Sequence, residues 1–343
     1  MLISDFDYDL PPALIAQEPL AERQASRMLI ADRASGTFRD GQFIEFPQLL
    51  NDGDLLVLNN TRVFPARLFG RSETGARIEI FLVREMESGV WETLARPARR
   101  LHDGKRIVFG NDLSSEVVGK SADGKVIIRF AASDDLEKQM DEIGKTPLPP
   151  YIKRDAIAID DDRERYQTVF AKQRGAIAAP TAGLHFTPEV LDAIRERNII
   201  VAEVTLHVGY GTFEPVRTED INQHSVSPES YEITRETAEV LNRAKRENRR
   251  IVAVGTTTTR ALESNISKFS TFTSAAHLAD LTITPGYAFK AVRALLTNFH
   301  LPKSSLLVLT STFGGHELIM EAYRHAVEEQ YRFYSYGDCM LIV

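Results

Sequence analysis

The spacing of apolar residues divides the chain into two regions of different character. From residue 63 to about residue 145, short segments alternate between apolar and polar positions, with turns between them. We expect strands at residues 64–70, 76–83, 90–95, 106–109 and 125–130. Asp-Gly at residues 123–124 is typical of a hairpin turn, and residues 103–104 and 74–75 carry similar pairs. This pattern predicts a small β-barrel.

On either side of this region, apolar runs typical of buried strands alternate with amphipathic helical patterns. The runs lie at residues 28–30, 54–58, 199–206, 251–254 and 306–309. Helices are expected from residue 188, from 235 to about 248 and from 316 to about 330. Thr187 and Thr234 can cap the first two of these helices. The proline-rich residues 147–154 lead the chain back from the barrel, so the larger domain is expected to be discontinuous.

Composition indicates an ordinary globular protein. Its 343 residues are 43% apolar, enough for two domains or one large domain with an insertion. The net charge of −7 argues against indiscriminate nucleic-acid binding but leaves room for a local basic patch. A single cysteine, Cys339, excludes an intramolecular disulfide framework and a Cys-rich zinc site. No run resembles a signal peptide or a membrane span, so we expect a cytoplasmic protein without membrane association.

Residues 175–186 form an unusual run of small side chains that contains Thr181, Gly183 and His185. Alanine and glycine make up half of it, so a ligand could approach its backbone closely. The helix expected from Pro188 follows directly, which places His185 near a helix N-terminus. Such a position favours an anion and lowers the pKa of an imidazole. The alternative is a tight turn with a structural, hydrogen-bonded histidine.

Polar residues also follow three of the expected strands. Asn59, Asn60, Thr61 and Arg62 follow the first, and His207 with two nearby glycines follows the second. After the third come Gly255, four threonines and Arg260 at the start of a helix. N–H and hydroxyl donors at such a turn suit an anion or a ribose, although the spacing is not that of a P-loop. Ordinary hydrogen-bonded turns would use the same residues.

Two groups of basic residues are candidates for contacts with nucleic acid. Within the expected barrel, cations cluster around one loop with His102: they are Arg96, Arg99, Arg100, Lys105 and Arg106. Near the C-terminus, Lys290, Arg293 and Lys303 are interleaved with aromatic residues, an arrangement that suits stacking on an unpaired base. A solvated charged loop and core aromatics are the alternatives.

Taken together, the motifs have a family resemblance. Seven segments in order are similar to those of the S-adenosylmethionine:tRNA ribosyltransferase-isomerases of queuosine synthesis: residues 59–67, 147–151, 179–186, 206–213, 255–260, 297–304 and 334–338. Residues 6–11 extend the likeness to almost the whole chain. Two positions depart from the family pattern. Ser227 stands where the second histidine of a His-x-x-His-x-Glu motif is common, between His224 and Glu229, and Thr284 stands where a tyrosine often precedes Pro-Gly-Tyr. A metal or paired-histidine role there is therefore not expected.

The resemblance implies a mixed α/β domain, here residues 1–62 and 147–343, that carries a β-barrel domain inserted at residues 63–146. It also implies the reaction. S-adenosylmethionine would donate its ribosyl moiety to 7-aminomethyl-7-deazaguanine at the tRNA wobble position, and epoxyqueuosine-tRNA, adenine and methionine would be the products. S-adenosylmethionine is consumed as a substrate, so we expect no cofactor and no metal. We expect a monomer whose partner is the tRNA anticodon loop.

This reaction requires a base for a proton beside the sulfonium and an acid for the departing adenine. Our candidates for that acid–base work are His185, His207 and Asp338, each beside glycines at the end of an element. The expected substrate contacts are Thr181, Thr257, Thr258, Arg260 and Arg62. Residues expected to hold the anticodon loop are Lys290, Arg293, Asn298, His300 and Lys303.

Two other functions remain open at this point. A methyltransferase would also use S-adenosylmethionine, but the chain lacks a glycine-rich loop after a first strand with an acid on the next. A non-catalytic RNA-binding protein would explain the basic loops and the aromatics, but it leaves the small-residue run at His185 without a purpose. Reaction products would separate the three functions.

Overall fold

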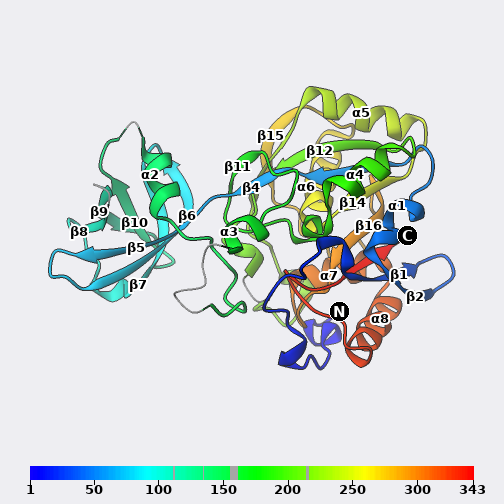
Figure 1. Ribbon diagram of the computed structural model, residues 1–343, viewed down its shortest axis with the longest axis horizontal. Coiled ribbons are helices and arrows are strands. Elements are labelled where there is room, and N and C mark those ends of the chain that lie inside the picture. Colours follow the sequence, from blue (N-terminus) through cyan, green and yellow to red (C-terminus); the bar gives the residue numbers. More distant parts are fainter. Residues whose placement is uncertain (111–112, 134, 155–160, 214–215) are drawn as a thin grey trace.

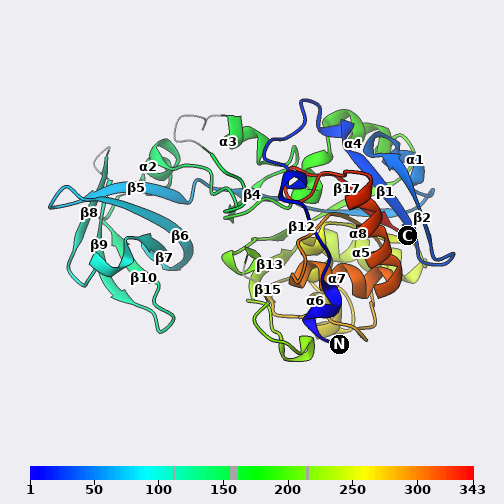
Figure 2. The ribbon, with the colours of Figure 1, turned by 90° about the horizontal axis from the view of Figure 1, so that it is seen from below.

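A computed structural model describes residues 1–110, 113–133, 135–154, 161–213 and 216–343. Two orthogonal views show a small lobe of strands beside a larger lobe of strands and helices (Figures 1 and 2). Both chain termini lie in the larger lobe (Figure 1). The expected fold class, a mixed sheet with helices and a small β-barrel, is confirmed.

The large lobe is built on a nine-stranded sheet in the order β15-β13-β12-β3-β14-β16-β17-β1-β2. Its strands are β1 (Arg27–Asp32), β2 (Thr37–Gln42), β3 (Leu55–Asn59), β12 (Ile200–Leu206), β13 (Glu229–Ile233), β14 (Ile251–Val254), β15 (Ala275–Ala279), β16 (Val292–Asn298) and β17 (Cys339–Ile342). The central strands β12, β3, β14 and β16 are parallel to one another. Their carboxyl ends therefore meet at one edge of the sheet.

Helices cover both faces of this sheet, which explains why the central strands read as continuous apolar runs. Alternate residues of β3 and β14 enter two different cores: Leu55 and Ile251 pack into one, Leu56 and Val252 into the other. The helices of this lobe are α1 (Phe46–Leu49), α3 (Asp161–Arg165), α4 (Pro188–Arg195), α5 (Arg235–Arg246), α6 (Thr256–Phe269), α7 (Ser305–Gly314) and α8 (His316–Glu328). α4 lies on the second core, and α5 to α8 lie on the first.

The helices expected from residues 188, 235 and 316 are confirmed as α4, α5 and α8. The hydroxyls of Thr187 and Thr234 accept hydrogen bonds from backbone N–H groups in the first turns of α4 and α5. The strand expected at residues 306–309 is wrong, because these residues lie in helix α7. Ser304 caps that helix by accepting from the N–H of Leu307 at 3.2 Å. A short apolar run fits a buried helix as well as a strand, so periodicity alone could not separate them.

The small lobe is a closed antiparallel barrel in the order β10-β7-β6-β5-β8-β9. Its strands are β5 (Arg67–Ser72), β6 (Arg77–Glu87), β7 (Val90–Arg96), β8 (Arg106–Gly110), β9 (Leu113–Lys120) and β10 (Val126–Phe130), and α2 (Leu136–Ile143) follows them. Gly75, Gly104 and Gly124 have positive φ angles of 79°, 79° and 84°, as the expected turns require. Strand β9 was not predicted, since its polar residues hide the alternation.

A short parallel pair of strands connects the lobes: β4 (Thr61–Val63), which continues from β3, and β11 (Gln173–Ala176). The chain enters and leaves the barrel at one place, where the backbones of Arg67 and Lys145 bond to each other. The side chain of Arg174 reaches across to Asp141 of α2 at 2.6 Å. Because β4 follows β3 directly, the carboxyl ends of the central strands face the barrel.

Candidate active site

The polar segments that follow the central strands converge at the carboxyl edge of the sheet. In open α/β sheets, ligands bind at that edge because the strand-to-helix turns leave a crevice there. A cavity of about 70 Å³ lies here. It is lined by Tyr151, Tyr166, residues 178–182, Val208, residues 255–257, residues 297–301, Ser304, Leu306, Tyr334 and Ser335. Segments far apart in the chain thus form one site, which we call the central cavity.

Two asparagines fix the strand ends under this cavity. The side chain of Asn59 donates to the carbonyl of Leu206 at 2.9 Å and accepts from the N–H of Leu206 at 3.0 Å. It also donates to the hydroxyl of Thr257 at 3.3 Å. Asn60 accepts from Thr205 and donates to Glu203. Both asparagines are buried. Their hydrogen bonds align β3 with β12 and α6 and engage the polar atoms of both side chains.

The turn from β14 into α6 forms one wall of the central cavity. Gly255 has a φ of 90°, and helix α6 begins at the next residue. The hydroxyl of Thr258 donates to the carbonyl of Val254 at 2.6 Å, so it is committed within the turn. Thr257 lines the cavity. Of the two threonines expected to donate to a substrate here, Thr257 therefore lines the cavity, whereas Thr258 does not because its hydroxyl is bonded within the turn.

Asn298 and His300 reach the central cavity from the end of β16. His300 is 8% exposed, and burial lowers its pKa to about 3, so its ring is neutral at pH 7. Its Nε2 lies 2.8 Å from the hydroxyl of Thr297. The amide of Asn298 donates to the carbonyl of Tyr334 at 3.0 Å, while its Oδ1 has no hydrogen-bond partner among the described residues. The side chain of Asn298 also acts on His185, whose pKa it raises.

Three tyrosines that we did not single out from the sequence line the central cavity: Tyr151, Tyr166 and Tyr334. The rings of Tyr151 and Tyr334 lie edge to face with centroids 3.9 Å apart. Tyr166 is fully buried, its hydroxyl has no partner in the described part of the chain, and burial raises its pKa to about 12. The sequence signal was weak: Tyr151 follows a proline run, and Tyr334 stands near a glycine. Aromatic residues in such places are usually core.

His185 lies at the end of a short helical turn, Thr181–His185, which also supplies Thr181 to the central cavity. Its ring faces a neighbouring cavity of about 20 Å³, and Ser335 lines both cavities. Nδ1 lies 2.8 Å from the hydroxyl of Ser26, and the buried Nε2 has no partner among the described residues. Burial lowers the pKa of His185 to about 4, an effect that Asn298 partly opposes. The imidazole is therefore neutral at pH 7.

His207 lies beside the central cavity rather than in its lining. Its Nδ1 is 2.8 Å from the hydroxyl of Thr61, and burial lowers its pKa. Gly175 passes so close that a Cβ there would lie 2.6 Å from the ring. The small-residue run thus allows the backbone to pack directly on the face of a histidine.

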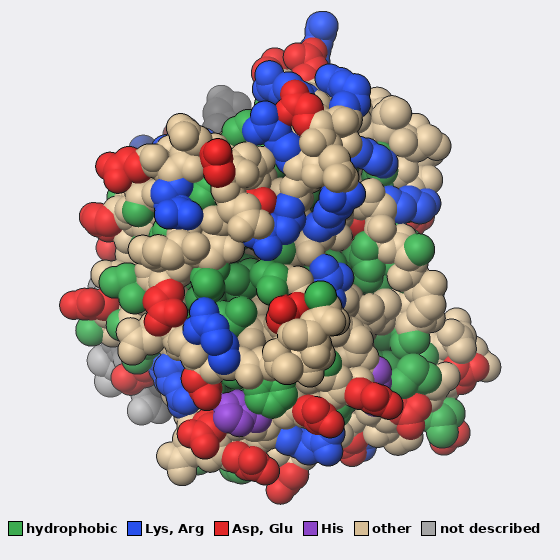
Figure 3. Space-filling model, turned by 90° about the vertical axis from the view of Figure 1, so that its right-hand side faces the viewer, with side chains coloured by type: hydrophobic (Ala, Val, Ile, Leu, Met, Phe, Trp, Pro, Cys, Tyr) green, Lys and Arg blue, Asp and Glu red, His purple; other side chains and the backbone are tan. Residues whose placement is uncertain are grey.

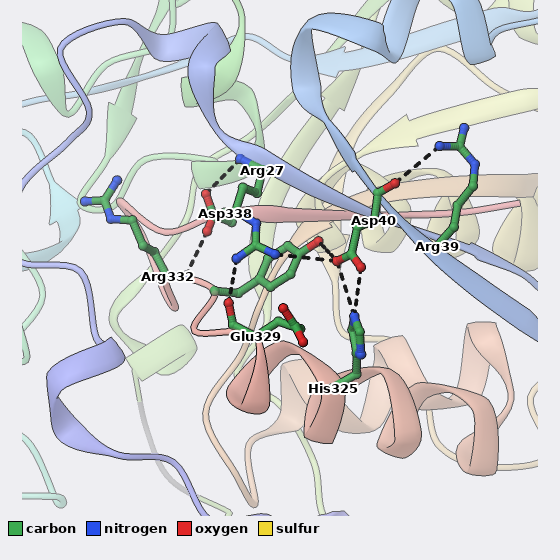
Figure 4. A network of polar contacts seen from close by, with 8 residues as sticks. Arg27, Arg39, Asp40, His325, Glu329, Arg332 and Asp338 are labelled. Carbon is green, nitrogen blue, oxygen red and sulfur yellow. Dashed lines mark hydrogen bonds and ion pairs between the residues drawn. The ribbon is translucent and has the colours of Figure 1, made fainter.

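Asp338 lies away from the cavity lining, in a polar network between β1, β17 and α8 (Figure 4). Its two carboxylate oxygens accept the backbone N–H groups of Arg27 at 2.9 Å and Arg332 at 2.8 Å. It is buried, and the burial raises its pKa. Near it, Asp40 accepts a hydrogen bond from Tyr331 and pairs with His325 at 3.1 Å. This geometry fixes the turn that carries Tyr334 and Ser335.

Arg260 lies in α6 and pairs with Glu229, and both side chains are buried. It also donates to the carbonyl of Ala279 at 2.7 Å. With His224 and Ser227 it lines a cavity of about 20 Å³ that shares Leu306 with the central cavity. No group of three metal-ligating side chains occurs among the described residues. Ser227 is exposed. It stands at the position where the family that the sequence resembles often has histidine.

The remaining predicted residues are not brought to the cavity. Arg62, Lys290, Arg293 and Lys303 are exposed, and Lys303 pairs with Asp7 at 2.6 Å. Arg293 stands at the start of β16 and Asn298 at its end, roughly 16 Å apart at the usual rise of a strand. None of the helices in the described part is long and apolar enough to cross a membrane.

Comparison with known proteins now places the chain. The family model described as "Queuosine biosynthesis protein" matches residues 3–342, almost the whole length. The chain belongs to the queuosine biosynthesis family. The resemblance drawn from the seven segments is therefore confirmed.

Relatives in the queuosine biosynthesis family cover the chain from end to end. Proteins named S-adenosylmethionine:tRNA ribosyltransferase-isomerase from Syntrophotalea carbinolica and Staphylococcus haemolyticus are 47% and 48% identical to it, each over 100% of both chains. A crystal structure of an S-adenosylmethionine tRNA ribosyltransferase from Thermotoga maritima is 37% identical, with a TM-score of 0.56 over 99% of this chain and 100% of that one. The likeness covers both lobes.

Proposed function

We propose that this queuosine family member transfers and isomerises the ribosyl moiety of S-adenosylmethionine onto 7-aminomethyl-7-deazaguanine at the wobble position of tRNA. Epoxyqueuosine-tRNA, adenine and methionine would be the products. The observation that carries this proposal is the central cavity, in which six of the seven family segments meet. The full-length relatives bear the name of this activity.

S-adenosylmethionine would bind at the central cavity and extend beyond it. Pockets that enclose ligands of similar size have volumes of about 300 Å³ or more, so 70 Å³ is too small for the whole molecule. The two small cavities beside it, at His185 and at Arg260, share lining residues with it. Thr181, Thr257, Asn298 and His300 would contact the substrate in the centre. Arg260, held by Glu229, would face a carboxylate from the side.

His185 remains our first candidate for the acid–base work, with His207 second. A neutral imidazole with an unpartnered Nε2 can accept a proton once a ligand brings one near. Asp338 has both oxygens engaged by backbone N–H groups. In this proposal its part is to hold the turn of Tyr334 and Ser335 in place. Arg62, Lys290 and Lys303 are exposed and would meet the tRNA, whose anticodon loop would present the base. Arg293 lies at the other end of β16 and donates to the carbonyl of Asn248, so we propose no tRNA contact for it.

We further propose that residues 63–146 form the inserted domain and residues 1–62 with 147–343 the discontinuous one. The protein would act as a cytoplasmic monomer without a cofactor or metal. Sedimentation at several protein concentrations tests the monomer, since a self-associating chain would sediment faster as concentration rises.

The decisive experiment is an incubation of the purified protein with S-adenosylmethionine and tRNA that carries the aminomethyl-deazaguanine. Mass spectrometry should find free adenine, free methionine and epoxyqueuosine in the tRNA. S-adenosylhomocysteine instead would identify a methyltransferase. Binding of the tRNA without any turnover would identify an RNA-binding protein.

A further inference from the structure

A large groove on the barrel has no part in the site described so far. Its volume is about 980 Å³. It is lined by Arg67, Phe69, Gly70, Arg71, Ser72, Arg77, Ile78, Glu79, Arg96, Val108, Phe109, Gly110, Lys145, Thr146, Leu148, Arg154 and Asp162. We call it the barrel groove. Residues of β5, β6, β7 and β8 line it, and we call the part at the connector that leaves the barrel its inner end.

The barrel groove is basic in a chain that is acidic as a whole. Six cationic side chains and two carboxylates line it, while the chain carries a net charge of −7. Both carboxylates are already neutralised: Glu79 pairs with Arg67 at 2.6 Å and Asp162 with Arg154 at 2.7 Å. The other four cations are Arg71, Arg77, Arg96 and Lys145, and none of them pairs with an acid in the described part of the chain. The groove therefore has positive charge available for a partner.

Strand register places these cations on one outward face. Arg71 lies opposite Arg77 across β5 and β6, and Glu79 lies opposite Arg96 across β6 and β7. Residues directly opposite in an antiparallel pair point to the same side of a sheet. Like charges at directly opposite positions lower the stability of a sheet, so a bound anion would relieve the repulsion between Arg71 and Arg77.

Exposed apolar side chains stand among the arginines. Phe69 is 49% exposed and Val108 is 46% exposed. The guanidinium of Arg67 lies 5.4 Å from the centroid of the Phe69 ring. A basic groove with an exposed aromatic is the arrangement that proteins use for single-stranded nucleic acid, where the backbone meets cations and a base stacks on the ring.

The inner end of the barrel groove approaches the central cavity. Asp162 lines the groove and accepts a hydrogen bond from the hydroxyl of Tyr336 at 2.9 Å. The ring of Tyr336 lies edge to face on that of Tyr166, with centroids 5.8 Å apart, and Tyr166 lines the central cavity. Two side chains therefore separate the groove from the cavity. A nucleic-acid strand in the groove would have its next bases at the site.

We propose that the barrel groove binds the sugar-phosphate backbone of the tRNA substrate while the wobble base lies at the edge of the central cavity, next to the bound S-adenosylmethionine. This inference rests on the proposed function. Charge and the exposed ring favour RNA over an acidic protein segment, and the short path to the cavity favours the RNA strand that carries the reacting base. Specific binding then comes from a local patch, which reconciles RNA as a substrate with the acidic net charge.

The test is a double variant, Arg77→Ala with Arg96→Ala, at two exposed positions. The probe is tRNA with 7-aminomethyl-7-deazaguanine at the wobble position, bound without S-adenosylmethionine over a series of salt concentrations. Removing two phosphate contacts should raise Kd at least about tenfold near 0.1 M salt and lower the slope of log K against log salt by roughly 1.5 to 2. Lysine at both positions should retain most of the binding, because it keeps the charge.

The matched control is Arg243→Ala with Arg246→Ala on α5, which removes the same charge from exposed positions on the large lobe. That helix lies at the top of Figure 1. Figure 3 shows the end of the molecule away from the barrel, where basic and acidic side chains are mixed and basic ones are frequent toward the top. The control should leave Kd unchanged. An equal loss in the control, or no loss in the groove variant, would overturn the inference.

Failure of the groove and failure of the proposed function give different results. If the unaltered protein releases no adenine or methionine with this tRNA, the proposed function fails. If it does, and the Arg77–Arg96 variant has an unchanged KM for tRNA, the groove holds no RNA and the inference fails alone. The inference predicts a raised KM for tRNA, a retained kcat at saturating tRNA and an unchanged affinity for S-adenosylmethionine.

Discussion

His185 shows how burial, with help from nearby arginines, can keep an imidazole neutral next to a ligand site. The ring packs at 5.3 Å from Phe43, Ser26 holds Nδ1, and no carboxylate in the described part of the chain pairs with it. Its position just before a helix agrees with the sequence argument, but its pKa is lowered by burial and by the nearby Arg23 and Arg332 rather than by the helix. The sequence could not show that the ring faces a side cavity, because that depends on how residues 26 and 335 fold against it.

Replacing His185 with alanine should lower turnover by at least about a hundredfold if the imidazole is the acid or base. Release of adenine at saturating substrates is the measurement, with the melting temperature recorded for each variant. Ser26→Ala is the control, because it removes the hydrogen bond to Nδ1 and keeps the ring. A near-normal rate for His185→Ala with an intact fold would exclude the role.

His300 should make the protein less stable in mild acid. Its pKa is about 3 in the folded protein against 6.5 in the unfolded chain, so below pH 6.5 the unfolded state binds the extra proton. Stability is fully present above pH 6.5 and falls as pH drops toward 3, by about 3 kcal/mol between pH 7 and 4. Urea unfolding of His300→Gln, which keeps an acceptor for Thr297, should show a shallower loss over this range than the unaltered protein. If the unfolding free energies of both proteins fall in parallel with pH, the prediction is contradicted.

The turn between β14 and α6 is the element that couples the sheet to the cavity. Its glycine and the helix start were recognisable from the sequence, and the helix follows as expected. What the sequence left open was the use of the threonines: one hydroxyl lines the cavity, and another bonds back to the strand. Hydroxyl direction depends on side-chain rotamers that packing selects, so residue type alone could not assign it.

Gly255→Ala should reduce both stability and turnover. A φ of 90° strains alanine by about 1–3 kcal/mol, and relief of that strain would move the cavity wall. Gly53→Ala is a matched control, since Gly53 has a φ of 79° in a turn outside the cavity. Thermal unfolding should show similar losses for the two variants, whereas a steady-state assay should show lower kcat only for Gly255→Ala. Equal kcat values would mean that the wall tolerates the change.

At the scale of the whole molecule, the two lobes have separate cores, and side chains of the large lobe reach the barrel core. The barrel core includes Ile177 from the small-residue run of the large lobe. The alternation of apolar and polar residues from 63 to 145 predicted a barrel, although it did not predict strand β9. Strand order in the large sheet was beyond the sequence, because β17 inserts between β16 and β1 from the far end of the chain. Pairing across such distances leaves no local pattern.

Arg174→Ala should loosen the barrel from the large lobe. Its guanidinium pairs with Asp141 of α2 and lies 5.0 Å from the ring centroid of Phe64. Hydrogen exchange should become faster in α2 and stay unchanged in β3 and β14, whose amides belong to the sheet. The control is Arg195→Ala, because its partner Asp192 lies on the same helix. Unchanged exchange in α2 would show that packing alone holds the lobes.

The paired backbones of Arg67 and Lys145 have a consequence for how such a chain could arise. Hydrogen bonds join them in both directions, at 3.3 Å and 2.8 Å, so the two ends of the barrel segment stand one strand spacing apart, about 4.8 Å. Excising the segment would leave a gap that a turn of a few residues can bridge, and the sheet beneath would keep its register. A gene that gained this segment would have acquired a new surface without having to refold the old one.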